Sequence, residues 1–172
     1  HLDVVHDALP VLAHGTDDGW GIALIVGTGS VAVGVDQQGH TVTKGGWGHW
    51  FGDKGSGFYL GYRALSAVAE ASDQIGPATL LSEMVMAQLG TQDPRSILMQ
   101  VSSGGDTRRA VAALAPIVMQ AAALKDKVAR RIVRGAVKEA VKLVAAVARE
   151  LGFDRPYPLA LAGGVVCSSQ IF

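Results

Sequence analysis

Apolar positions change their spacing along the chain, and each change predicts a different kind of element. Up to about residue 45, short apolar runs alternate with turns that contain glycine, which is typical of strands. Residues 21–27, GIALIVG, form a continuous β-branched run that predicts a buried strand. With further strands at 30–36 and 41–44, this region predicts a three-stranded meander, and a short strand is also expected at 2–6.

After residue 56 the apolar residues recur at helical spacing. The clearest pattern covers 125–152, where one apolar stripe follows steps of three or four residues and Gly152 stands at the expected end. Pro116 marks the expected position of a kink in a second helix. The other predicted helices cover 55–73, 77–90 and 106–124.

The last part of the chain returns to an extended pattern. Residues 157–163, YPLALAG, predict a buried strand that ends in two glycines, where a new helix begins. Strands, then a block of helices, then a strand leading into a helix indicate an α/β fold with a long helical insertion. Because the chain starts with His1 and stops soon after this turn, we expect it to be a fragment of a longer protein.

Composition narrows the class of protein. The 172 residues are 49% hydrophobic and 17% charged, which favours a folded globular domain over a disordered chain. Fifteen basic and fifteen acidic residues cancel, which argues against a general affinity for nucleic acid or an anionic membrane surface. No apolar run reaches membrane-spanning length. The single cysteine, Cys167, cannot form an internal disulfide, so a cytoplasmic location is expected.

Two glycine motifs are candidate sites for a phosphate or a nucleotide. GTGS, residues 27–30, joins two predicted strands; its glycines let N–H groups approach an anion, and Thr28 and Ser30 add hydroxyl donors. LAGGV, residues 161–165, turns from a strand into a helix without a Cβ that would block a nucleotide. Taken alone, GTGS is better interpreted as an ordinary glycine hairpin turn, and LAGGV alone is a weak signal that also fits a tight strand-to-helix connection.

The segment GGWGHWFGDKGSG, residues 45–57, contains six glycines and suits a small polar ligand. Trp47 and Trp50 offer flat apolar faces of the kind that stack on sugar rings, and the Asp53 carboxylate can accept hydrogen bonds from two neighbouring hydroxyls. For His49, a structural hydrogen bond that shapes the loop is at least as good an interpretation as a catalytic role.

An aspartate is a candidate general base. Asp7 ends the first predicted strand, where a carboxylate is well placed to take a proton from a substrate hydroxyl. Taken alone, Asp7 is more safely interpreted as a capping or turn aspartate. Other aspartates compete with it by composition alone: Asp3, Asp17 and Asp18.

In this order, the motifs resemble the N-acetylglucosamine kinase and BadF/BadG-type ATPase family, part of the sugar kinase, heat-shock protein 70 and actin superfamily. The resemblance runs from about Asp7 to the end of the chain, and GGWG followed by GD.GS is its most specific part. It implies a ribonuclease H-like (actin-like ATPase) α/β domain, of which residues 1–172 would be a C-terminal fragment. The N-terminal domain with the first phosphate motif and the final helices would then be missing.

The resemblance also implies a reaction, the transfer of the γ-phosphoryl group of Mg-ATP to an amino sugar or hexose. No residue of this chain is assigned to the magnesium ion, because the aspartate that helps to hold it belongs to the absent first motif. The implied roles are the catalytic base for Asp7, the second phosphate loop for Gly27, Thr28, Gly29 and Ser30, the adenosine motif for Gly163 and Gly164, and the sugar site for Gly46, Trp47 and Asp53.

One position departs from the family pattern and leaves the identity of the sugar substrate open. Val31 follows GTGS at the position where animal N-acetylglucosamine kinases have a sugar-contacting asparagine, so glucosamine or another hexose is an alternative substrate. A small-molecule sugar is the expected partner, and the resemblance is compatible with a homodimer.

Two other functions stay open at this point. Some members of the family are ATPases that activate a dehydratase, and these hold an iron–sulfur cluster with cysteines at a dimer interface, which a single Cys167 fits poorly. The absent first phosphate motif favours the other alternative, a non-catalytic nucleotide- or sugar-binding module.

Overall fold

The computed structural model describes residues 10–12, 14–16, 19–103 and 105–167 of the chain. The strand expected at 2–6 and the candidate base Asp7 lie outside these residues. Within them, no helix combines the length and the apolar character needed to cross a bilayer.

A four-stranded sheet forms one end of the molecule. The first three strands form an antiparallel meander, and the fourth pairs parallel with the first, so the strand order is β3-β2-β1-β4. Both the predicted meander and the predicted late strand are confirmed, but the late strand is not buried as expected, since Leu159 and Leu161 are exposed. The strands are β1 (Gly21–Val26), β2 (Ser30–Val35), β3 (Thr41–Gly45) and β4 (Leu159–Ala162).

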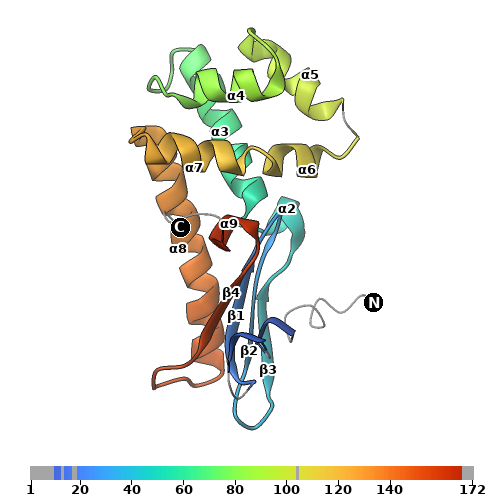
Figure 1. The fold of residues 1–172 in the computed structure, drawn as a ribbon, viewed down its shortest axis with the longest axis vertical. Helices are drawn as coiled ribbons and strands as arrows, with labels where there is room; N and C mark the ends of the chain where they lie inside the picture. The colour runs from blue at the N-terminus through green and yellow to red at the C-terminus, as the bar shows by residue number, and fades with distance from the viewer. Residues whose placement is uncertain (1–9, 13, 17–18, 104, 168–172) are drawn as a thin grey trace.

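Helices form the rest of the described structure. In Figure 1 the longest of them, α8, runs along the sheet, while α4, α5, α6 and α7 gather at the opposite end of the molecule. The helices are α2 (Gly48–Phe51), α3 (Gly57–Ser72), α4 (Leu81–Leu89), α5 (Ile97–Ser102), α6 (Thr107–Ala112), α7 (Ala115–Ala123), α8 (Lys127–Glu150) and α9 (Gly164–Cys167), with a short 3₁₀ helix, η1, at Pro94–Ser96.

The main core lies between the sheet and the helices. Ile22, Leu24 and Val26 of β1 face it and belong to one buried cluster with residues of α3 and α8, such as Leu60 and Val147. The alternate residues of the sheet form a second small cluster, in which Ile25 packs against the buried Val31 and Val33. Successive side chains of β2 therefore lie on opposite faces of the sheet, and both faces are apolar.

Two predicted helices are shorter than their patterns. The helix predicted at 106–124 is divided into α6 and α7, and Pro116 lies in the first turn of α7. The helix is therefore interrupted before Pro116 and is not kinked at it. In the first turn of α7 the missing N–H of the proline costs no helical hydrogen bond. The helix predicted at 77–90 begins only at Leu81, although Gly90 ends it in the left-handed conformation as expected.

Asp126 explains the late start of α4. It is the N-cap of α8, and burial raises its pKa, but hydrogen bonds from two backbone N–H groups and one hydroxyl outweigh burial and hold the pKa below its ordinary value. The donors are Ala129 N–H at 2.8 Å, Leu80 N–H at 3.0 Å and Thr79 Oγ1 at 3.0 Å. One carboxylate therefore joins the beginnings of α4 and α8.

Replacing Asp126 by alanine should lower the free energy of unfolding at pH 7 by about 1–2 kcal/mol, the usual cost of a lost cap. Because the folded-state pKa is depressed, the stabilisation is present above the unfolded pKa of about 4 and is lost as the pH falls through the folded-state value. Urea denaturation at pH 7 and at pH 3 measures this. Asp93→Ala, which removes an exposed cap from η1, is the control, and an equal loss in both variants would contradict the prediction.

Candidate functional site

The GTGS turn between β1 and β2 is held by the first turn of α3. Gly27 O accepts a hydrogen bond from Gly57 N–H at 2.8 Å, and Thr28 O accepts one from Phe58 N–H at 3.2 Å. Within the turn, Gly27 N–H donates to Gly29 O at 3.0 Å. The turn thus has a fixed position at the end of the sheet that faces the helices.

GDKGS, residues 52–56, is the turn that begins α3. Ser56 is fully buried and caps the helix by accepting a hydrogen bond from Tyr59 N–H at 3.2 Å, while its own N–H donates to Asp53 O at 3.1 Å. Gly55 has φ +90° and lies against α8, where a Cβ would come within 2.7 Å of Ala136 O. Part of the glycine content of this segment therefore has a structural cause.

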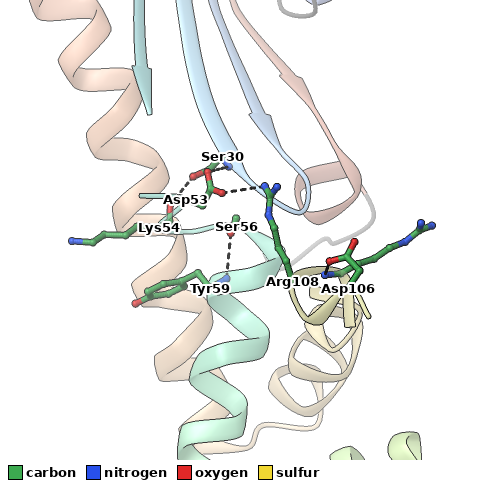
Figure 2. A network of polar contacts seen from close by, with 8 residues as sticks. Ser30, Asp53, Lys54, Ser56, Tyr59, Asp106 and Arg108 are labelled. Atoms are coloured by element: carbon green, nitrogen blue, oxygen red, sulfur yellow. Dashed lines mark hydrogen bonds and ion pairs between the residues drawn. The ribbon is translucent and has the colours of Figure 1, made fainter. Parts of the chain in front are cut away.

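Asp53 joins the predicted sugar loop to the predicted phosphate loop, as Figure 2 shows. Its side chain is 4% exposed; Oδ1 accepts a hydrogen bond from Ser30 N–H at 3.1 Å and Oδ2 accepts one from Arg108 Nη2 at 3.2 Å. Ser30 Oγ donates in turn to Lys54 O at 3.0 Å. Two motifs that are separate in the sequence are thus parts of one polar network.

The tryptophans beside this network are open to solvent. Gly46 lies next to the phosphate loop, since its N–H donates to Ser30 O at 2.9 Å, and Trp47 follows it with 76% of its surface exposed. Trp50 is 82% exposed. His49 packs between aromatic rings, with centroid distances of 4.8 Å to Trp50 and 4.9 Å to Phe58.

A cavity of about 560 Å³ opens beside the GTGS turn, within the size range of small-molecule sites. Gly27 and Thr28 line one side, and Gly164 of α9 lines another, so both predicted glycine motifs reach the same cavity. The wall opposite comes from α6 and α7 and is mainly apolar apart from Arg109. Its remaining residues are Ala112, Ala113, Ala115, Pro116 and Met119.

Gly163 brings the two glycine motifs together. It has φ +100°, and a Cβ at this position would lie 2.4 Å from Val26 O and 3.0 Å from Gly27 N. Only glycine therefore lets the turn from β4 into α9 pass directly behind the end of β1.

Replacing Gly163 by alanine should lower the free energy of unfolding by about 2–4 kcal/mol, from backbone overlap and from the strained φ. The matched control is Gly164→Ala, because a Cβ on Gly164 meets no atom within 4 Å and its φ is ordinary. Urea denaturation of both variants measures the difference. Similar stabilities of the two variants would show that the close approach of Gly163 to β1 is not needed.

Sequence reasoning missed two arginines at this site. Arg108 and Arg109 were part of a predicted helix, yet Arg108 reaches Asp53 and Arg109 lines the cavity. The available signal was the pair itself, two adjacent cations at the start of an otherwise apolar segment.

Comparisons with known proteins show what the chain is similar to. The chain matches the BadF/BadG/BcrA/BcrD ATPase family over residues 1–171. It is 34% identical over 164 residues to an N-acetylmuramic acid/N-acetylglucosamine kinase from Clostridium acetobutylicum, covering 95% of this chain and 54% of that protein. It is 32% identical over 168 residues to an N-acetyl-D-glucosamine kinase from Dictyostelium discoideum, covering 95% and 53%. The chain thus spans about half the length of these relatives.

Solved structures show the same fold. A protein from Chromobacterium violaceum, provisionally named an N-acetylglucosamine kinase, superposes with a TM-score of 0.74 at 32% identity, covering 90% of this chain and 52% of that one. A protein of the same provisional name from Porphyromonas gingivalis has a TM-score of 0.57 at 19% identity, covering 91% and 58%, and supports the fold alone. The predicted actin-like α/β class is confirmed, and the chain belongs to the BadF/BadG/BcrA/BcrD ATPase family.

Proposed function

We propose that the protein carrying this chain is an ATP-dependent kinase of an amino sugar or another hexose. The observation that carries the proposal is the hydrogen bond from Ser30 N–H to the Asp53 carboxylate, in a loop whose Gly27 and Thr28 line a cavity of about 560 Å³. A sugar site and a phosphate site in direct contact are what phosphoryl transfer between two bound molecules requires. The names of the relatives, which are kinases of N-acetylglucosamine or N-acetylmuramic acid, agree with this chemistry.

In the proposed reaction, a sugar hydroxyl oxygen bonds to the γ-phosphorus of ATP. The bond from that phosphorus to the oxygen bridging it to the β-phosphate breaks, ADP leaves, and the hydroxyl proton passes to Asp7. The protein would contribute mainly by positioning the two substrates and by neutralising the negative charge of the phosphates. Gly27, Thr28, Gly29 and Ser30 would border the phosphates, and the N–H groups of Thr28 and Gly29 would bind them, since Gly27 N–H and Ser30 N–H already donate within the protein. Gly163 and Gly164 would border the adenosine, and Gly46, Trp47 and Asp53 would hold the sugar.

Magnesium enters this proposal with the nucleotide, whose phosphate charge it would neutralise. The described residues contain no group of three histidine, cysteine, aspartate or glutamate side chains that could hold a metal ion. We therefore assign no residue of this chain to the ion.

The surroundings of Val31 bear on the choice of sugar. Its side chain is 8% exposed and packs with Val33 and Ile25, so it offers no hydrogen bond to an acetamido group. The candidate substrates are therefore N-acetylglucosamine, N-acetylmuramic acid, glucosamine and other hexoses.

A coupled assay of ADP release from the intact protein, with this panel of sugars, tests the proposal. We expect ADP release that depends on one sugar or a small group of them. If folded protein releases no ADP with any sugar, the kinase proposal fails. Sugar-independent ATP hydrolysis together with a stoichiometric iron–sulfur cluster after anaerobic purification would instead favour the dehydratase-activating function.

A further inference from the structure

Arg108 connects the helical block to the phosphate loop. It lies in α6, and its Nη2 reaches Asp53 Oδ2 at 3.2 Å, beside the turn between β1 and β2. The guanidinium lies directly against Gly29, since a Cβ on Gly29 would be 2.9 Å from Arg108 Nη2 and 2.9 Å from each carboxylate oxygen of Asp53. No side chain therefore separates the cation from the backbone of the turn.

The hydrogen-bonding capacity of Arg108 is not used up by the protein. A guanidinium carries five N–H donors, and Asp53 takes one of them. Nε is buried and has no hydrogen-bond acceptor among the described residues. The side chain as a whole is 41% exposed, so a ligand can still reach it. A buried, unsatisfied N–H on a charged group is costly unless an acceptor arrives with a ligand.

The chemistry of the position indicates which acceptor this is. The backbone N–H groups of Thr28 and Gly29, for which the described residues give no acceptor, suit an anion. A planar guanidinium binds phosphate oxygens in a bidentate way. Arg108 lies beside both Asp53, on the proposed sugar side, and Gly29, in the proposed phosphate loop. The group that lies between a bound sugar and the rest of a nucleotide is the terminal phosphate.

We propose that Arg108 binds the terminal phosphate of the nucleotide over Gly29 and, through its ion pair with Asp53, links the position of that phosphate to the sugar site. This inference rests on the proposed kinase function. It makes Arg108 a residue that distinguishes a nucleoside triphosphate from a diphosphate. Arg109 has a different place, since it lines the cavity beside Thr28.

Calorimetric titration of the intact protein with ADP and with the non-hydrolysable ATP analogue AMP-PNP tests this. In Arg108→Gln, affinity for the analogue should fall about 10- to 100-fold, whereas affinity for ADP should change less than about threefold. Arg108→Lys keeps the charge but not the planar pair of donors, so it should fall between these values. Arg131→Gln, on the exposed side of α8, is the matched control and should leave both affinities unchanged.

A double variant guards against misfolding. Arg108→Gln alone leaves the buried Asp53 without its cation, which could destabilise the fold. The double variant Asp53→Asn/Arg108→Gln removes both charges, and it should show the same selective loss of affinity for the analogue. If either folded variant keeps the wild-type preference between the two nucleotides, or loses affinity for both equally, the role of Arg108 is overturned. A folded wild-type protein that binds neither nucleotide overturns the kinase proposal as well, which separates the two failures.

Discussion

Replacing Asp53 by alanine is expected to lower kcat/KM for the sugar by about 10²–10⁴-fold. Two hydrogen bonds between sugar hydroxyls and a charged acceptor are lost, each contributing about 1.5–3 kcal/mol. The protein itself also loses stability, because the Ser30 N–H and the Arg108 cation lose their acceptor. Since Arg108 is 41% exposed, we expect this second loss to be about 2 kcal/mol, below the range for fully buried pairs.

Asp53→Asn separates the two effects. Asp53 has φ +51°, a left-handed conformation that asparagine tolerates better than alanine, and the asparagine oxygen can still accept from Ser30 N–H. Its amide NH₂ would face Arg108 Nη2 and cannot accept from it, so this variant should lose some stability, but less than Asp53→Ala, and still lose activity. Asp73→Ala, which breaks an exposed pair with Arg95, is the control and should change neither quantity by much. Steady-state kinetics measures the activity of each variant, and urea denaturation measures its stability. An unchanged sugar KM in Asp53→Asn would show that Asp53 does not bind the sugar.

Replacing Asp7 by asparagine should lower kcat by about 10²–10⁴-fold, the usual contribution of a positioned general base. Affinity for ATP should hardly change, because the proposed role of Asp7 is to take the proton of the sugar hydroxyl. Single-turnover kinetics for the chemical step and calorimetry for ATP binding measure the two effects.

The controls for Asp7 are the aspartates that compete with it in the sequence. Asp3→Asn, Asp17→Asn and Asp18→Asn should all keep wild-type turnover. If Asp7→Asn is as active as wild type while one of the others is inactive, the base has been placed on the wrong residue.

The sheet and the long helix could be predicted because their causes are local. GIALIVG has the continuous β-branched pattern of a buried strand, and the stripe over 125–152 has a helical period, so β1 and α8 are found within two residues of their expected bounds. The start of α4 could not be predicted in this way. Leu80 N–H bonds to Asp126, a residue far along the chain whose position depends on α8.

The same distinction applies to the site. The motifs could be found because glycine, tryptophan and aspartate in a fixed order indicate a ligand. Arg108 could not be placed, because its contact with Asp53 depends on how α6 packs against α3, and no local pattern encodes that packing. Its unsatisfied Nε is visible only in three dimensions.

The parallel pairing of β1 with β4 also bears on how the chain folds. The β1–β2 hairpin pairs residues that are close in the sequence, whereas the pairing of Ile22 with Leu159 closes a loop that contains all the intervening helices. Closing such a long loop is slow, so the turn through Gly163 should join the cavity late in folding. A nucleotide bound in the cavity would contact both the β1–β2 turn, which forms early, and the β4–α9 turn, which forms late. Its binding would therefore stabilise the late-forming contacts of β4 and α9 against local unfolding.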